Sequence, residues 1–134
     1  MKDDMLRAPE HPIAILVVED DLTFQQVITL GLLSYGYSVA TAENGATALE
    51  QIANSRFDAI ITDLLMPVMD GLDLAAQLKK QPVTRDIPVV LMSGRKLEAK
   101  LDEDNVFAAM LAKPFTLEEL NATVERLVGR GKLI

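Results

Sequence analysis

Two patterns alternate along this chain, and their alternation restricts the fold more than any other feature of the sequence. Short apolar runs of strand length, such as "IAILVV" at 13–18, alternate with segments whose apolar residues recur every three to four positions. A continuous apolar run is typical of a strand that is covered on both faces. The expected strands are 13–18, 37–41, 57–62, 88–93 and 107–112.

The segments between these strands have the periodicity of helices. It is clear over 24–35, 45–53 and 71–78 and weak over 96–104, and a last helix is expected after Thr116, which forms a capping box with Glu119. Strands that alternate with helices pair in parallel through right-handed crossovers. We therefore predict an α/β fold: a doubly wound, five-stranded parallel sheet of order 2-1-3-4-5, flavodoxin-like, with helices on both faces.

Length and composition fit one globular domain. The chain has 134 residues, of which 49% are hydrophobic and 25% charged. Residues 1–12 are polar and contain two prolines, so we expect a flexible leader before a domain at 13–129 and a short tail at 130–134. The sole histidine, His11, lies in that leader and is expected to be solvated rather than catalytic.

Charge and cysteine content argue against several classes of protein. A net charge of −7 gives no footprint for direct binding to nucleic acid or to an anionic membrane surface. The absence of cysteine excludes disulfides, thiolate metal sites and a cysteine nucleophile. No apolar run approaches the ~20 residues of a membrane helix, and the start lacks a signal-peptide pattern. The expected location is cytoplasmic.

Polar residues follow four of the predicted strands, at the edge where an open parallel sheet binds ligands. Glu19 and Asp20 follow the first strand, Asp63 the third, Ser93 the fourth and Lys113 the fifth. Carboxylates gathered in one crevice repel one another, and a hard divalent cation, Mg²⁺ or Mn²⁺, relieves that repulsion. Such a site is usually completed by phosphate, which lysine and serine can contact. The set predicts phosphate chemistry with a carboxylate nucleophile.

Each of these motifs also has a purely structural interpretation. Acids after a strand can cap the next helix, and Ser-Gly or Lys-Pro pairs are common in turns and loops. Met66 and Met69, which follow Asp63, are expected to pack rather than to bind. The functional interpretation depends on compatible groups at four strand ends, which the predicted topology places in one crevice.

Four blocks, "ILVVEDD", "TDLLMPVMDG", "LMSG" and "LAKPF", resemble the receiver domain of two-component response regulators in their order and spacing. The resemblance covers Ile13 to about Gly129 and is closest to the single-domain, chemotaxis-regulator-like type. It implies that Asp63 is the phospho-acceptor, and that Glu19, Asp20, Asp63 and the backbone carbonyl of Leu65 hold Mg²⁺.

The resemblance also implies roles at the other strand ends. Ser93 and Lys113 contact the phosphoryl group, and the peptide bond between Lys113 and Pro114 is a candidate for the cis form. The phosphoryl donor is a sensor histidine kinase or a histidine phosphotransfer protein. Phosphorylation shifts a two-state equilibrium at the face of the fourth helix, fifth strand and fifth helix, which signals to an unidentified protein target. We expect a phosphorelay switch rather than an enzyme, either a monomer or a phosphorylation-dependent dimer.

The sequence departs from the family pattern in two places, and two further residues bear on hydrolysis. Met110 stands where the family has a switch aromatic, so we expect weaker or rerouted coupling to the output face. Val106 and Phe107 replace the usual Gly-Ala, which together with the weak 96–104 pattern predicts a short or irregular fourth helix. Leu65 and Arg95 flank the path of an attacking water and predict slow self-dephosphorylation.

Three other functions compete with this interpretation. A non-phosphorylated pseudo-receiver that serves as a docking module is favoured by Met110 but opposed by Asp63, Ser93 and Lys113. A magnesium-dependent phosphohydrolase would need a general acid where Leu65 stands. A nucleotide- or flavin-binding fold would need glycines in the loop after the first strand.

Overall fold

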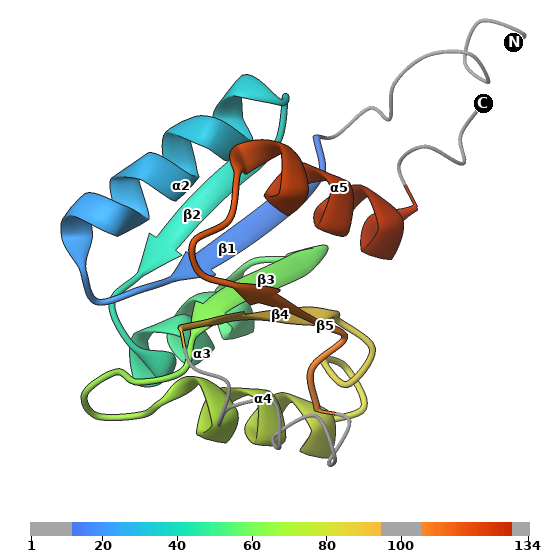
Figure 1. Cartoon of the computed structure of the whole chain (residues 1–134). Helices are drawn as coiled ribbons and strands as arrows, with labels where there is room; N and C mark the ends of the chain where they lie inside the picture. Colours follow the sequence, from blue (N-terminus) through green and yellow to red (C-terminus); the bar gives the residue numbers. More distant parts are fainter. Residues whose placement is uncertain (1–11, 95–105, 130–134) are drawn as a thin grey trace, which may run out of the picture.

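The computed structural model describes residues 12–94 and 106–129 and contains a five-stranded, all-parallel sheet of order β2-β1-β3-β4-β5 (Figure 1). This is the predicted fold and strand order. Each strand begins one or two residues after its expected start. The strands are β1 (Ala14–Val18), β2 (Ser38–Ala42), β3 (Ala59–Asp63), β4 (Val89–Ser93) and β5 (Ala109–Ala112).

Helices cover both faces of the sheet. They are α2 (Leu22–Ser34), α3 (Gly45–Asn54), α4 (Gly71–Lys80) and α5 (Leu117–Val128). The predicted capping box of α5 is present: the Thr116 hydroxyl accepts from the Glu119 N–H, and the Glu119 carboxylate accepts from the Thr116 N–H. The weak helix expected over 96–104 lies outside the described residues. In the described part of the chain, no helix has the length and apolar character needed to cross a membrane.

The sheet separates two hydrophobic clusters (Figure 1). On one side α2 and α5 pack through Ile28, Leu32, Leu120 and Val124 on the side chains of Ile15 and its same-face neighbours. On the other side α3 and α4 pack through Ala48, Leu74, Ala75 and Leu78. β1, β3 and β4 are buried on both faces, which explains their continuous apolar runs.

Helix α2 differs from the expected pattern. The periodicity over 24–35 predicts one buried apolar face, but Val27 in this segment is half exposed, and Gln25 is buried instead. The Gln25 side-chain amide donates to the backbone carbonyls of Glu19 and Ala42, so burial does not leave its NH₂ group unpaired. The helix is apolar nearly all round, and periodicity therefore could not fix its rotation.

The register of the central strands brings their carboxyl ends together at one end of the sheet. Val18 of β1 lies beside Thr62 of β3, and Asp63 lies beside Met92 of β4. The residues just after β1 therefore meet the last residue of β3 at the carboxyl edge. The strand order changes direction between β1 and β3, so the carboxyl ends of these two strands form the topological switch point of the sheet.

Candidate functional site

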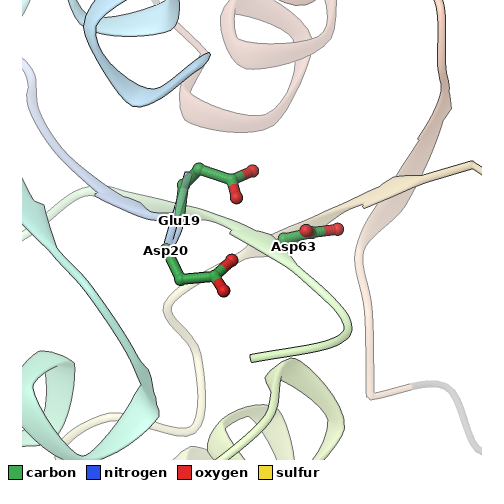
Figure 2. A group of neighbouring side chains, drawn as sticks. All are labelled: Glu19, Asp20 and Asp63. Atoms are coloured by element: carbon green, nitrogen blue, oxygen red, sulfur yellow. The ribbon is translucent and has the colours of Figure 1, made fainter. Parts of the chain in front are cut away.

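Three acids meet at the carboxyl edge of the sheet. Glu19 and Asp20 follow β1, Asp63 ends β3, and one carboxylate oxygen from each lies within 4.8 Å of the others (Figure 2). Neighbouring parallel strands that end at the same level bring these side chains together. The three acids that were predicted to share one crevice are therefore together, although 42 residues separate Asp20 from Asp63 in the chain.

Lys113 supplies positive charge to this cluster from the end of β5. Its Nζ lies 3.4 Å from Oδ1 of Asp63 and 3.9 Å from Oε1 of Glu19. The backbone N–H of Lys113 donates to the carbonyl of Ser93 at 2.6 Å, which holds the end of β5 against β4. The Lys113–Pro114 peptide bond is cis. Four predicted strand-end groups thus lie in one place.

Glu19 is the least solvated of the acids, with 2% of its surface exposed. Its Oε2 accepts from the N–H of Asp21, whereas its Oε1 is buried without a hydrogen-bond partner. Burial, reinforced by the nearby charge of Asp63, raises the pKa of Glu19 to about 7. A buried acid with an unpaired oxygen is costly unless a cation approaches it.

Asp63 is fixed by its own neighbours in the chain. Its Oδ1 accepts from the N–H of Leu64 at 2.9 Å, and its backbone carbonyl accepts from the Thr62 hydroxyl at 2.8 Å. A Cβ at position 71 would lie 2.2 Å from the backbone oxygen of Asp63, so only glycine allows α4 to begin this close to the acid. The following loop exposes Leu65 and Val68 to solvent.

The remaining predicted residues have different surroundings. Ser93 is buried at the end of β4, in register with Ala112 of β5. Met110 is partly buried and packs with the cluster beneath α3 and α4. Arg95 lies outside the described residues. Asp21, which follows the two acids of the cluster, is the N-cap of α2 and accepts from the N–H groups of Thr23 and Phe24.

Two residues at the site were not identified from the sequence as part of it. Gln25 supports the backbone of Glu19 from α2, and the ring of Phe24 lies 4.7 Å from Lys113 Nζ. Both are on the first turns of α2, directly after the acids. Their position in the chain was a usable signal, but Phe24 also begins the periodic apolar segment 24–35, which is typical of a helix face that packs on a core.

The donor set fits a magnesium ion. Within residues 12–94 and 106–129, all of its side-chain ligand atoms are carboxylate oxygens, which Mg²⁺ prefers. Oε1 of Glu19 is buried without a hydrogen-bond partner and lies 3.9 Å from Lys113 Nζ, within this cluster. The chemistry of these residues therefore suits a hard cation.

The sequence of residues 15–125 matches the family described as the response regulator receiver domain. The chain belongs to this family. Response regulator MprA of Mycobacterium sp. strain KMS is 37% identical over 127 residues, which cover 89% of this chain and 52% of that protein. The chain thus spans about half the length of the curated relatives that it matches.

Two solved structures resemble this receiver domain closely. Chemotaxis response regulator CheY4 of Vibrio cholerae is 31% identical with a TM-score of 0.80, over 87% of this chain and 98% of that one. The receiver domain of sensor histidine kinase PA1611 from Pseudomonas aeruginosa PAO1 is 32% identical with a TM-score of 0.79, over 88% and 98%. The PA1611 structure has a magnesium ion coordinated in its active-site cleft. This chain is accordingly a receiver domain of two-component signalling.

Proposed function

We propose that this receiver domain accepts a phosphoryl group on Asp63 from the phosphohistidine of a histidine kinase or a phosphotransfer protein. The observation that carries the proposal is the position of Lys113 Nζ, 3.4 Å from Asp63 Oδ1, beside a cluster of three carboxylates. A lysine this close to an acid at the switch edge of a parallel sheet can bind one oxygen of an incoming phosphoryl group.

Glu19, Asp20, Asp63 and the backbone carbonyl of Leu65 are the residues that would hold magnesium. The three acids are close enough to share one ion, and the Leu65 carbonyl follows Asp63 by two residues. When bound, the ion supplies positive charge that offsets the negative charge of the phosphoryl oxygens. Its binding would also favour the ionised form of Glu19, whose pKa is raised without it.

In the transfer itself, a carboxylate oxygen of Asp63 forms a bond to phosphorus as the phosphorus–nitrogen bond of the donor breaks. The imidazole leaves as the nucleophile enters from the opposite side. Lys113 stabilises one equatorial oxygen of the phosphoryl group, and the hydroxyl of Ser93 contacts another. The Leu64 N–H, which donates to Asp63 Oδ1, keeps the carboxylate in a fixed orientation.

Phosphorylation then acts as a switch. Ser93 moves toward the phosphoryl group and rearranges the segment after β4, which signals through the face formed with β5 and α5 to a protein target. Because Met110 is flexible and only partly buried, it lacks the two defined states of an aromatic switch, so the coupling is weaker. Exposed Leu65, two residues after Asp63, hinders the attacking water and makes hydrolysis of the acyl phosphate slow.

The test is the intact mass after incubation with Mg²⁺ and a small phosphodonor. The wild type should gain one phosphate, Asp63→Asn should gain none, and Asp58→Asn, at the opposite edge of the sheet, should behave as the wild type. Failure of the wild type to gain mass would favour the alternative, a non-phosphorylated pseudo-receiver that only docks. Continuous release of phosphate from unrelated esters would instead indicate a hydrolase.

A further inference from the structure

An aromatic ring lies against the ammonium group of Lys113. Nζ is 4.7 Å from the centroid of the Phe24 ring, while it is 3.4 Å from Asp63 Oδ1 and 3.9 Å from Glu19 Oε1. A cation within ~6 Å of a ring centroid is attracted to the ring face. The ammonium group is therefore in contact with two acids and with an aromatic ring.

Phe24 is held both through its backbone and through its ring. Its backbone N–H donates to Oδ1 of Asp21 at 3.2 Å, which sets the first turn of α2 next to the acids. Its ring meets the ring of Phe115 edge to face, with centroids 6.1 Å apart and planes at 68°. Phe115 follows the cis bond two residues after Lys113, so the same short segment carries both the cation and the second ring.

The close packing of α2 and α5 supports this arrangement. A Cβ at position 31 of α2 would lie 2.6 Å from the Leu117 side chain of α5, so glycine lets the two helices approach closely. The first turn of α2 and the segment that leads from β5 into α5 also meet through the contact between the Phe24 and Phe115 rings. The Phe24 ring over Lys113 is part of the packing between these two segments.

We propose that Phe24 is a positioning residue for Lys113 in the phosphoryl-transfer site. A lysine side chain has four rotatable bonds, and 29% of the Lys113 side chain is exposed, so the acids alone leave it several solvated positions. The ring face restricts the ammonium group to the position from which it reaches Asp63. The proposal rests on the proposed function, because positioning matters only if Asp63 accepts a phosphoryl group.

Phe24 also packs against the hydrophobic cluster beneath α2 and α5, so a purely structural role is the alternative. Two substitutions separate the roles. Phe24→Tyr keeps a ring face over the cation, whereas Phe24→Leu keeps an apolar side chain that favours a helix but removes the ring. Leu30→Ala is the matched control, because Leu30 lies on the same helix and 67% of it is exposed.

The first measurement needs no phosphodonor. In protein labelled with ¹³C-lysine, the ring current should move the Lys113 CεHε resonance upfield in the wild type, Phe24→Tyr and Leu30→Ala. In Phe24→Leu the resonance should move toward the position of the exposed lysines. An unchanged Lys113 resonance in folded Phe24→Leu would overturn the positioning role, even if Asp63 is phosphorylated normally.

The second measurement is the rate of phosphorylation by a small phosphodonor with Mg²⁺. Phe24→Leu should be about three- to tenfold slower, the factor that the loss of one cation–π contact allows. Phe24→Tyr should restore most of the rate, and Leu30→Ala should match the wild type. Equal rates for Leu and Tyr would overturn the proposal. If the wild type takes no phosphate, the proposed function is refuted. The resonance shift would then still show whether the Phe24 ring positions Lys113.

Discussion

An acid lies beside β1 at each end of the sheet, the amino edge and the carboxyl edge of its strands, and the two acids have opposite environments. At the amino edge Asp58 accepts from the Ala14 N–H at 2.9 Å and donates its own N–H to the Ala14 carbonyl at 2.7 Å. At the carboxyl edge Glu19 is 2% exposed, its Oε1 has no hydrogen-bond partner, and burial raises its pKa to about 7. One acid fastens two strands, and the other is held in an unfavourable environment.

This difference shows which edge is built for a ligand. A side chain that only stabilises the fold satisfies its polar groups internally, as Asp58 does. Acids that remain close together at a cost in stability are typical of sites where a cation or a reacting group completes the set. Four predictions test this contrast.

The largest effect is expected on magnesium binding. Asp20→Asn should weaken binding of Mg²⁺ about a hundredfold, ~3 kcal/mol, because it removes a charged, exposed ligand from the cluster of three acids without disturbing the core. Calorimetric titration of the unphosphorylated protein measures this. Asp58→Asn should leave the affinity unchanged, and similar losses in both variants would mean that the ion does not bind at this edge.

The second effect concerns the dependence of stability on pH. The pKa of Glu19 is raised from 4.5 to about 7 in the folded state, so folding favours its protonated form. The unfolded chain releases this proton as pH rises past about 4.5, and the folded chain keeps it until about 7. The contribution of Glu19 is therefore fully present at low pH and is lost as pH rises between these values.

Glu19→Gln should remove this loss. In urea unfolding without divalent cations, the free energy of unfolding of the variant, relative to that of the wild type, should rise by about 2 to 3 kcal/mol between pH 4.5 and pH 8. Mg²⁺ at pH 8 should narrow the gap, since the ion stabilises the ionised wild type. A gap that is constant with pH would show that the carboxyl group of Glu19 is not strained in the fold.

The sequence was sufficient to predict the sheet and the members of the acidic cluster. Apolar runs of strand length specify parallel strands, and parallel strands that end together force Glu19, Asp20 and Asp63 to one edge whatever their loops do. The approach of Lys113 follows from the same topology. These conclusions need only the strand ends, which short apolar runs mark well.

The details of α2 could not be predicted in the same way. Its apolar residues occupy nearly every side of the helix, so the choice between burying Gln25 and burying Val27 depended on the carbonyls that the Gln25 amide could reach. The contact of Phe24 with Lys113 depends in turn on that rotation. Pairings between distant segments of this kind leave no periodic trace in the sequence.

The third effect concerns the stabilising role of Asp58 at the amino edge. Asp58→Ala should lower the free energy of unfolding by about 1 to 1.5 kcal/mol, because the Ala14 N–H loses its acceptor. Arg56→Ala should change it much less, since the pair with Asp58 is 3.9 Å apart and the arginine side chain is 91% exposed. Urea unfolding measures both. Equal losses would mean that the ion pair, rather than the hydrogen bond, is the important contact of Asp58.

The smallest effect concerns backbone strain in the loops at the two edges. Among the described residues, Val68 is the only one other than glycine with a positive φ, 70°, and it is 84% exposed in the loop that follows Asp63. A β-branched residue is unfavourable in this conformation, whereas asparagine tolerates it. Val68→Asn should therefore raise the free energy of unfolding by about 1 kcal/mol.

Val83, in the loop that leads into β4 at the opposite edge, provides the matched control. It is 90% exposed and does not have a positive φ, so Val83→Asn makes the same chemical change without relief of strain. Thermal unfolding should show a higher midpoint for Val68→Asn than for Val83→Asn. Because changes in the unfolded chain are common to both variants, equal midpoints would show that the loop beside the acceptor stores no strain, and that the two edges differ in charge alone.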